Sequence, residues 1–220
     1  RIEQRSGAFR TALSKPVLVA GRIHHMTHAE SIVARGDADM VGMVRAQVCD
    51  PEIVSKAFDL RSDDIRACIG CNQACIGHRH SGAPISCIQN PVTGRELTLS
   101  KLSQANPPRR VLVAGGGPAG MKAAAIAATR GHHVTLYEQS TKLGGQARLA
   151  ERLPGRSEFG GLISNLEREM ANAGVHVVMD QQVDHALISE HTPDVVIVAT
   201  GGAPFRPTVE GQKDGHVVDA

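Results

Sequence analysis

Five cysteines are the first residues whose type and spacing suggest chemistry. Cys68, Cys71, Cys75 and Cys87 follow one another as C-x2-C-x3-C-x11-C, while Cys49 stands apart. Three cysteines in a tight loop and a fourth further along suit a [4Fe-4S] cube, in which each iron takes one thiolate. Zinc, which prefers two closely spaced pairs, and reduced structural cysteines remain open as alternatives. We expect Cys49 to be a buried apolar residue rather than a ligand.

A glycine-rich turn is the second chemical signal. It follows an apolar run and carries a G-x-G-x-x-G fingerprint, whose candidate cofactor contacts are Gly115, Gly117, Pro118, Ala119 and Gly120. Such glycines permit a tight turn, close approach of a pyrophosphate, and packing of the helix on the strand. Glu138 closes the next strand, where an acid accepts hydrogen bonds from a ribose hydroxyl. The pattern favours FAD, NAD or ADP over NADP, and a purely structural turn is the alternative.

Two later segments consist of small residues that leave space beside the backbone. Gly145 and Gln146 belong to LGGQ (143–146), and Thr200 and Gly201 end the strand DVVIVATG. Either segment alone could be only a turn. Together and in this order they resemble the FAD-binding domain of flavoproteins with two dinucleotide domains.

The surrounding sequence alternates strand and helix signals. Residues 15–21 and 37–45 read as buried strands, each followed by a short helix, the second of which we expect Pro51 to open. This order implies parallel strands joined by right-handed crossovers, the last units of something larger. The two strand ends offer a candidate FMN phosphate site. It would consist of the backbone N–H groups of Gly21, Arg22 and Val44 together with the Arg45 guanidinium. The alternative is that Arg45 is simply solvated, as arginine at a strand end commonly is.

The second half of the chain predicts a separate domain. Residues 109–138 read as strand, glycine-rich turn, helix and strand, which is one βαβ unit. A helix is expected near 157–173, followed by strands at 175–179 and 194–201. The polar stretch 94–108 ends in a double proline and is the best linker candidate.

Composition sets limits on partners. The chain of 220 residues has 24 Lys+Arg against 22 Asp+Glu and is 41% hydrophobic, with apolar runs too short to cross a bilayer. We expect a soluble, cytoplasmic protein with a small-molecule substrate, without a nucleic acid or membrane partner, and with a homo-oligomer as an open option. The chain starts without Met and stops just after a new unit begins, so we expect a piece of a longer protein.

The motifs together carry a family resemblance. CIGCNQAC, SCIQNP, VAGGGPAGMKAA, LGGQ and VIVATG resemble, in this order, the family of 2,4-dienoyl-CoA reductase and trimethylamine dehydrogenase. The resemblance implies an α/β architecture: the end of a TIM barrel carrying FMN (1–60), a 4Fe-4S cluster loop (61–95), a linker (96–109) and the first part of a Rossmann-like FAD domain (110–220). It implies an oxidoreductase whose substrate-binding catalytic residues precede Arg1 and whose NAD(P)H region follows, so that this piece alone would not turn over substrate.

The resemblance leaves the direction of electron flow open. The x3 gap between Cys71 and Cys75 is similar to the dienoyl-CoA reductase branch, which takes electrons from NAD(P)H. The stretches GHRHSGAPISCIQNPVTGRE and LPGRSEFGGLISNL are similar to N-methylproline demethylases. We favour oxidative N-demethylation because these two stretches comprise more residues than the single x3 spacing. A non-catalytic electron-transfer module and a zinc-stapled dinucleotide-binding protein are the alternatives from other classes.

Overall fold

The chain divides into two compact units, residues 1–103 and 104–220, which are described separately. The computed structural model describes residues 2–203. The division falls inside the polar stretch expected as a linker. The expected bounds of the four segments stay predictions.

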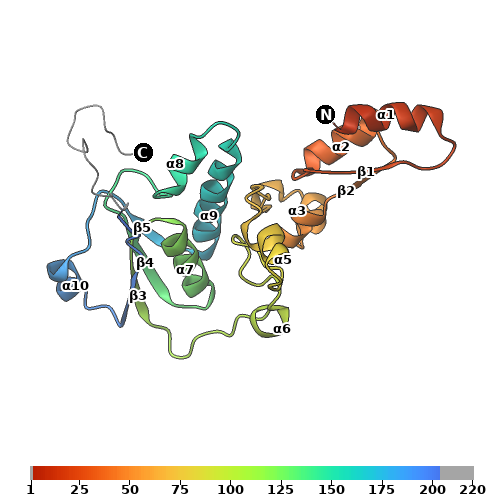
Figure 1. Cartoon of the computed structure of the whole chain (residues 1–220). Coiled ribbons are helices and arrows are strands. Elements are labelled where there is room, and N and C mark those ends of the chain that lie inside the picture. The colour runs from red at the N-terminus through yellow and green to blue at the C-terminus, as the bar shows by residue number, and fades with distance from the viewer. Residues whose placement is uncertain (1, 204–220) are drawn as a thin grey trace, which may run out of the picture. The chain divides into compact units, whose positions relative to one another are not determined.

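The first unit begins with two parallel strands joined by a helix. β1 (Leu18–Ala20) pairs in parallel with β2 (Met40–Gly42), and α2 (Met26–Ala34) lies between them in the chain (Figure 1). Ile32 of α2 is fully buried in a cluster with Val19 of β1, because the branched apolar residues of both elements point to one side. The parallel strands expected here are confirmed. The helix α1 (Ile2–Ala12), which precedes them, was not expected.

The expected strand over 37–45 is too long. It ends at Gly42, because the backbone of Met43 leaves the extended region (φ −123°, ψ 44°). Gln47 N–H then donates to the carbonyl of Met43 at 3.1 Å, which starts the helix α3 (Val44–Cys49). Pro51 does not open the next helix directly, since Pro51 and Glu52 form a turn before α4 (Ile53–Phe58).

The cysteine-containing segment has little regular structure. Its short helical turns are η1 (Ser62–Asp64), a π-helical turn η2 (Gln73–Gly77), α5 (His78–His80) and α6 (Glu96–Leu99). Between the second and third cysteines, Asn72 adopts the left-handed conformation (φ 58°) directly before η2.

The second unit is built on a parallel sheet. Its strands are β3 (Arg110–Ala114), β4 (His133–Tyr137), β5 (His176–Val178) and β6 (Val195–Val198). They lie in the order β5-β4-β3-β6, and every pair is parallel. Strands are present at all four expected places, but β6 ends at Val198, so Thr200 and Gly201 follow the strand rather than end it. The order places the glycine-rich turn after a central strand.

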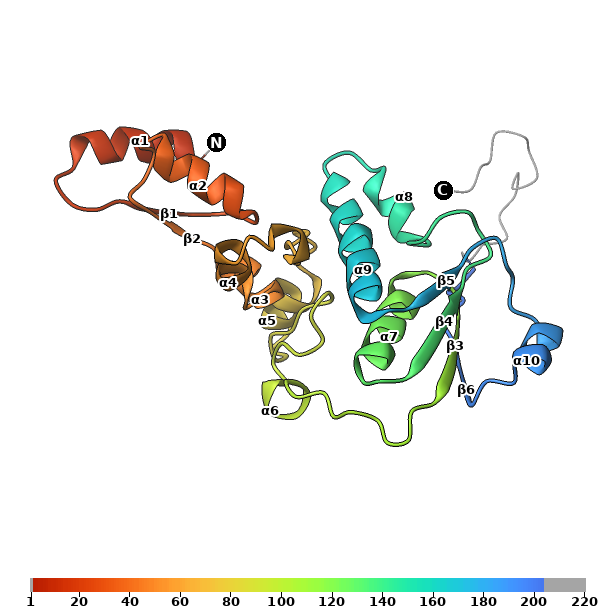
Figure 2. The same cartoon turned by 180° about the vertical axis from the view of Figure 1, so that it is seen from behind.

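Helices lie on both faces of this sheet (Figures 1 and 2). α7 (Pro118–Thr129) packs against α9 (Gly160–Ala173) on one face, and α9 follows the short turn η3 (Ser157–Phe159). The short helix α8 (Ala147–Glu151) precedes η3 in the chain. On the other face, α10 (His185–His191) places Leu187 against Leu112 and Tyr137. The doubly covered sheet explains why its strands are runs of Val, Ile and Leu rather than alternating patterns.

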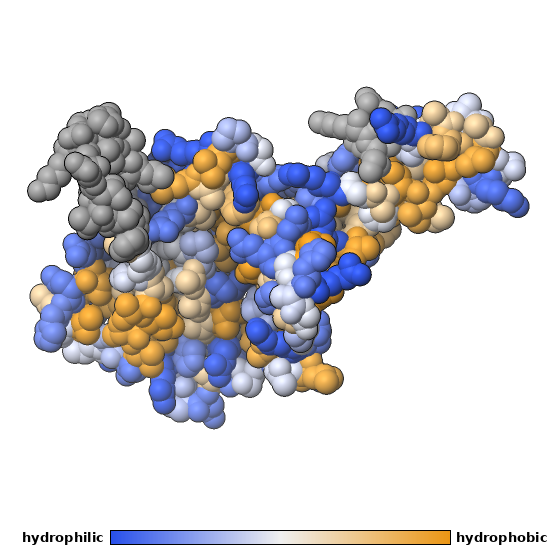
Figure 3. Space-filling view, viewed as in Figure 1, coloured by the Kyte–Doolittle hydropathy of each residue, from blue (hydrophilic) through white to orange (hydrophobic). Residues whose placement is uncertain are grey.

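The first unit leaves apolar side chains uncovered around its two strands. Leu18 and Met40 of the paired strands are 57% and 52% exposed, and Phe9, Leu13 and Val33 of the adjoining segments are exposed as well. Figure 3 shows this surface in orange over α1, α2 and β1. Among the described residues, no helix is long and apolar enough to cross a membrane.

Candidate cofactor sites

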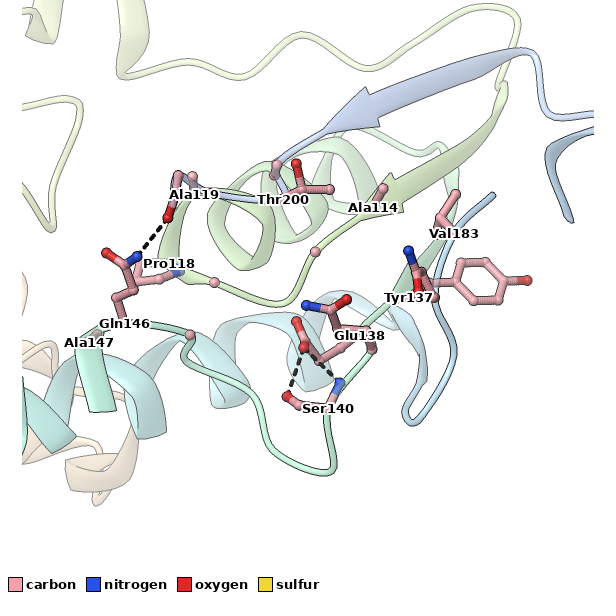
Figure 4. Close-up of a pocket in the computed structure, with 18 of the residues that line it drawn as sticks. Ala114, Pro118, Ala119, Tyr137, Glu138, Ser140, Gln146, Ala147, Val183 and Thr200 are labelled. Carbon is pink, nitrogen blue, oxygen red and sulfur yellow. Dashed lines mark hydrogen bonds between the residues drawn. The ribbon is translucent and has the colours of Figure 1, made fainter. Parts of the chain in front are cut away.

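A cavity of about 710 Å³ opens where the strands of the second unit end (Figure 4). Parallel strands of this kind bind ligands outside their carboxyl ends. Nine of the ten residues expected to contact FAD line the cavity: Gly115, Gly117, Pro118, Ala119, Glu138, Gly145, Gln146, Thr200 and Gly201. The tenth, Gly120, is buried in the first turn of α7.

Glycine occurs at the three fingerprint positions for different physical reasons. Gly115 has a positive φ of 110°, and a Cβ there would lie 2.4 Å from the carbonyl oxygen of Ala199. A Cβ on Gly120 would lie 1.9 Å from the carbonyl oxygen of Gly115, so this glycine lets α7 approach the strand end. Gly117 has an ordinary φ of −72°, and a Cβ there meets no atom within 4 Å. Neither conformation nor protein packing requires a glycine at 117, which leaves a ligand against the backbone as the physical reason.

Glu138 is held rigidly at the cavity wall, directly after β4. Its Oε2 accepts from the Gly116 N–H at 2.6 Å, and its Oε1 accepts from the Ser140 N–H and hydroxyl at 2.9 and 2.7 Å. Burial raises the pKa of the Glu138 carboxyl, but the bonds from Ser140 and Gly116 outweigh it and hold the pKa below its usual value. The group is therefore a charged acceptor, which suits a ribose hydroxyl.

Two loops border the cavity and are tied to the rest of the site. Gly144 N–H donates to the carbonyl of Gly116 at 2.8 Å, and Gln146 Nε2 donates to the carbonyl of Gly202 at 2.8 Å. The cavity is also lined by residues that the sequence interpretation did not name: Tyr137, Gln139, Ser140, Gln181, Gln182 and Val183. Ser140 could have been found, because a hydroxyl two residues after the acid can reach its carboxylate. No pattern in the sequence marks Gln181 to Val183.

In the first unit, the four clustered cysteines line one small cavity, together with Arg45, Asn72 and Gln89. Backbone N–H groups donate to three of the sulfurs: Gly70 to Cys68, Gln73 to Cys71, and Gln89 and Asn90 to Cys87. Such donors stabilise thiolate sulfur. The donor set and the surrounding N–H groups fit an iron–sulfur cube.

The spacing of the cysteines bears on the choice of metal. Among the residues that the structure describes, no three His, Cys, Asp or Glu side chains lie close enough to hold one metal ion. A tetrahedral zinc site draws its thiolates around a single atom, whereas a cube spreads them over four irons. The sequence spacing C-x2-C-x3-C-x11-C is what favours the cube over zinc.

Cys49 lies next to this cluster and is 1% exposed. As expected, it is buried, but it also contacts Cys87. Its hydrogen bond lowers the pKa of the Cys87 thiol to about 6 against the effect of burial, and the same contact raises the pKa of Cys49. Burial raises the pKa values of Cys68 and Cys71.

The candidate FMN residues lie at the ends of the paired strands. Gly21 and Arg22 follow β1 with positive φ values of 139° and 51°, and Val44 and Arg45 open α3 after β2. The Arg45 guanidinium donates to Asn72 Oδ1 at 2.6 Å and lines the cysteine cavity. The structure thus connects Arg45 to the cysteine segment, and its contact with an FMN phosphate stays a prediction.

The parallel sheet with its glycine fingerprint and acid defines a Rossmann-type dinucleotide-binding domain. Residues 109–220 match the family of pyridine nucleotide-disulphide oxidoreductases, and residues 1–64 match the NADH:flavin oxidoreductase / NADH oxidase family. The chain belongs to the flavoprotein oxidoreductases that combine these two regions, and residues 1–64 form the end of a TIM-type barrel. FMN, a [4Fe-4S] cluster and FAD with NAD(P)H are the cofactors of this family.

Individual relatives differ in activity. The chain is 43% identical over 197 residues to an NADH oxidase of Thermoanaerobacter brockii, covering 89% of this chain and 30% of the relative. It is 40% identical to an N,N-dimethylglycine/sarcosine dehydrogenase of Chromohalobacter salexigens and 39% identical to a probable N-methylproline demethylase of Rhizobium meliloti, each covering 90% of this chain and 29% of the relative.

The solved structure of a 2-naphthoyl-CoA reductase matches with a TM-score of 0.91 at 31% identity, over 97% of this chain and 33% of that one. The chain spans about 30% of the length of the curated relatives it matches.

Proposed function

We propose that this chain is the electron-carrying part of a flavin-dependent dehydrogenase that oxidatively demethylates an N-methyl amine such as N-methylproline. The observation that carries the electron-transfer role is the single cavity lined by Cys68, Cys71, Cys75 and Cys87, with N–H donors on three of the sulfurs. These four thiolates hold a [4Fe-4S] cube. When bound, the flavins exchange electron pairs with small molecules and the cube passes single electrons between the flavins.

The residues of the second unit bind FAD in this proposal. Gly115 and Gly117 let the pyrophosphate approach the backbone, and the first turn of α7 offers N–H groups without partners inside the helix. Glu138 accepts hydrogen bonds from the adenosine ribose. Gly145, Gln146, Thr200 and Gly201 border the rest of the cofactor, where no bulky side chain intrudes.

The first unit contributes to FMN binding through its strand ends. Backbone N–H groups of Gly21, Arg22 and Val44 hold the phosphate, and Arg45 supplies positive charge between the phosphate and the cysteine segment. The bond from Arg45 to Asn72 supports this intermediate position.

The substrate class rests on the relatives. Two of them, the dimethylglycine/sarcosine dehydrogenase and the probable N-methylproline demethylase, are named for reactions of N-methyl amines. In such a reaction the amine loses a hydride from its N-methyl group to FMN, when bound, and water converts the resulting iminium ion to formaldehyde and the demethylated amine with release of a proton. The partner is a small molecule, and we propose no nucleic acid or membrane partner.

Anaerobic mixing of the full-length protein with N-methylproline tests the proposal. We expect the flavin absorbance to bleach on mixing and formaldehyde to appear on turnover with an electron acceptor. Proline, which lacks the methyl group, is the matched control and should leave the flavin oxidised. Bleaching by NADH or NADPH alone, without bleaching by any N-methyl amine, would contradict the substrate assignment.

A second candidate is an NAD(P)H-dependent reductase of an enoyl or dienoyl thioester. The x3 spacing between Cys71 and Cys75 and the likeness to the 2-naphthoyl-CoA reductase structure favour it. It predicts that a reduced enzyme is reoxidised by such a thioester in the same stopped-flow experiment.

A further inference from the structure

The side chains of two buried residues at the cysteine cavity, Cys49 and Gln89, have no place in the cofactor contacts proposed above. Cys49 is 1% exposed and Gln89 is 3% exposed. Gln89 Nε2 donates to Cys49 Sγ at 3.2 Å and to the carbonyl oxygen of Ala67 at 3.0 Å. The amide therefore ties Cys49 of α3 to the backbone directly before the first clustered cysteine.

The orientation of the Gln89 amide is fixed by its surroundings. A flipped amide would set Oε1 against the carbonyl oxygen of Ala67, and two acceptors repel each other. In the observed orientation Oε1 is buried without a hydrogen-bond partner, which costs free energy. The two hydrogen bonds donated by Nε2 therefore hold the amide in place, and one of them goes to the sulfur atom of Cys49.

This arrangement sets the direction in which the Cys49 thiol donates. Its sulfur already accepts a hydrogen bond from Gln89, so its own S–H points to another acceptor. The sulfur of Cys87 is in hydrogen-bonding contact with Cys49. The order of donation is therefore from the Gln89 amide to Cys49, and from the Cys49 thiol to Cys87.

Cys87 also receives backbone donors. The N–H groups of both Gln89 and Asn90 donate to its sulfur, whereas Gly70 alone donates to Cys68. Cys49 adds a side-chain donor to this set. Negative charge on the Cys87 sulfur is accordingly well stabilised.

We propose that Cys49 is a positioning residue that donates its thiol hydrogen to the Cys87 sulfur and raises the reduction potential of the cluster. The proposal rests on the assignment of Cys87 as a ligand under the proposed function. One-electron reduction adds negative charge to the cluster and its thiolates, so a donor to a ligand sulfur stabilises the reduced form more than the oxidised form.

The test is a redox titration of the cofactor-loaded full-length protein, followed by magnetic resonance of the reduced cluster. Cys49→Ala removes the donor, and Cys49→Ser restores a hydroxyl donor at the same place. Gln89→Met removes both amide bonds while keeping the side-chain length. Ile53→Val, a small truncation at a fully buried position of the same unit, is the matched control for loosened packing. Iron and acid-labile sulfide are measured for every variant.

We expect Cys49→Ala to keep four irons and to disfavour the reduced cluster about three- to tenfold, a downward shift of about 30 to 60 mV at 59 mV per tenfold. Cys49→Ser should recover part of the shift, Gln89→Met should move the potential in the same direction by less, and Ile53→Val should not move it. In protein labelled with 15N, which marks the protons of the N–H donors, an exchangeable coupled proton that is not bonded to nitrogen should be present in the wild type and in Gln89→Met; if Cys49→Ala does not fold, this coupling and the Gln89→Met shift decide the matter.

An unchanged potential in iron-loaded Cys49→Ala, or an unchanged potential in Gln89→Met without an exchangeable coupled proton that is not bonded to nitrogen, would overturn the proposal. Loss of iron from both Cys49 variants would overturn it too, since Cys49 would then be a ligand. Cys87→Ala separates the two levels: if it retains four irons, the ligand assignment in the proposed function is wrong, whereas loss of iron there with no shift in Cys49→Ala removes only the hydrogen-bond proposal.

Discussion

The atoms around each glycine of the fingerprint indicate its role. The Gly115 carbonyl oxygen leaves no space for a side chain at Gly120, whereas no protein atom occupies the space beside Gly117, where a ligand could bind. The two positions therefore separate folding from binding, although both belong to the same motif.

Alanine at these two positions should give opposite results. Gly120→Ala is expected to lower the free energy of unfolding by about 1 to 3 kcal/mol, since the backbone must move to admit the methyl group. Gly117→Ala should change stability by less than about 1 kcal/mol while weakening FAD binding on the order of tenfold, because the methyl group occupies the pyrophosphate's approach. Urea unfolding of the apoprotein and titration of apoprotein with FAD measure the two effects. Equal losses of stability in both variants would contradict this distinction.

Glu138 should determine affinity for the adenosine ribose. Glu138→Gln replaces a charged acceptor by a neutral one and is expected to weaken FAD binding by about 1 to 3 kcal/mol. Quenching of flavin fluorescence on titration into apoprotein gives the dissociation constant. Glu190→Gln, the same change at an exposed position of α10, is the control. An unchanged constant for Glu138→Gln would remove the ribose contact from the proposal.

At the scale of elements, a buried ion pair holds the segment that leads to the cysteines. Asp50, with a side chain 3% exposed, accepts from Lys56 Nζ and from the Arg66 N–H, both at 2.8 Å. Burial raises the pKa of the Asp50 carboxyl, but the bonds from Lys56 and Arg66 outweigh it and leave the pKa below its usual value. The ionised carboxylate joins α3, α4 and the start of the cysteine segment.

Removing this charge should destabilise the first unit and change its response to acid. Asp50→Asn leaves the largely buried ammonium of Lys56 with only the exposed carboxylate of Glu52, 4.0 Å away, as counter-ion, at an expected cost of about 3 to 5 kcal/mol. Because the folded-state pKa is lowered, the wild type keeps this stabilisation above the unfolded value of about 3.9 and loses it as the pH falls below that value. Chemical unfolding between pH 3 and 7 should show the loss in the wild type and a flatter dependence in Asp50→Asn. Matching curves for the two proteins would show that the pair contributes nothing.

The elements of the second unit were the easier ones to predict. β3, α7 and β4 could be predicted because the short apolar runs, the glycine-rich turn and the alanine-rich helix each have the residue types that their observed structure favours. The helix α10 was missed because it has seven residues and little periodicity, although Asp184, whose Oδ1 accepts from the Leu187 N–H at 2.9 Å, is a readable cap. The helix α3 was missed because its apolar residues continue the pattern of β2, and only the turn at Met43 ends the strand.

The candidate sites were predictable to different depths. Glycines and cysteines could be named because their roles depend on local spacing. Cys49 and Gln89 are 40 residues apart, so their contact depends on how the chain returns to α3. For the same reason the bond between Arg45 and Asn72 could not be expected, and the sequence placed Arg45 only at the strand end.

At the scale of the whole molecule, the two cavities belong to different compact units. The cysteine cavity is formed within residues 45–89 and the dinucleotide cavity within residues 114–202. We therefore expect each cofactor to bind without the residues that line the site of the other.

Cys71→Ala should therefore remove the cube and spare FAD. A cube needs all of its thiolates, so we expect loss of iron and of the reduced-state magnetic resonance signal. FAD content after extensive dialysis should stay at the wild-type level. A variant that keeps four irons with the same signal would show that Cys71 is not a ligand.

The hydrogen bonds around Cys49 determine how much of the chain a transferred iron–sulfur segment would need. The carbonyl of Val48 accepts from the Thr93 hydroxyl at 2.8 Å, Gln89 bonds to Cys49, and Arg66 bonds to Asp50 and to the carbonyl of Cys49. Each of these bonds joins α3 to the cysteine-bearing stretch. A transplantable iron–sulfur cassette would accordingly have to span residues 44–95, since a graft of the cysteine loop alone would leave behind the scaffold that shapes it.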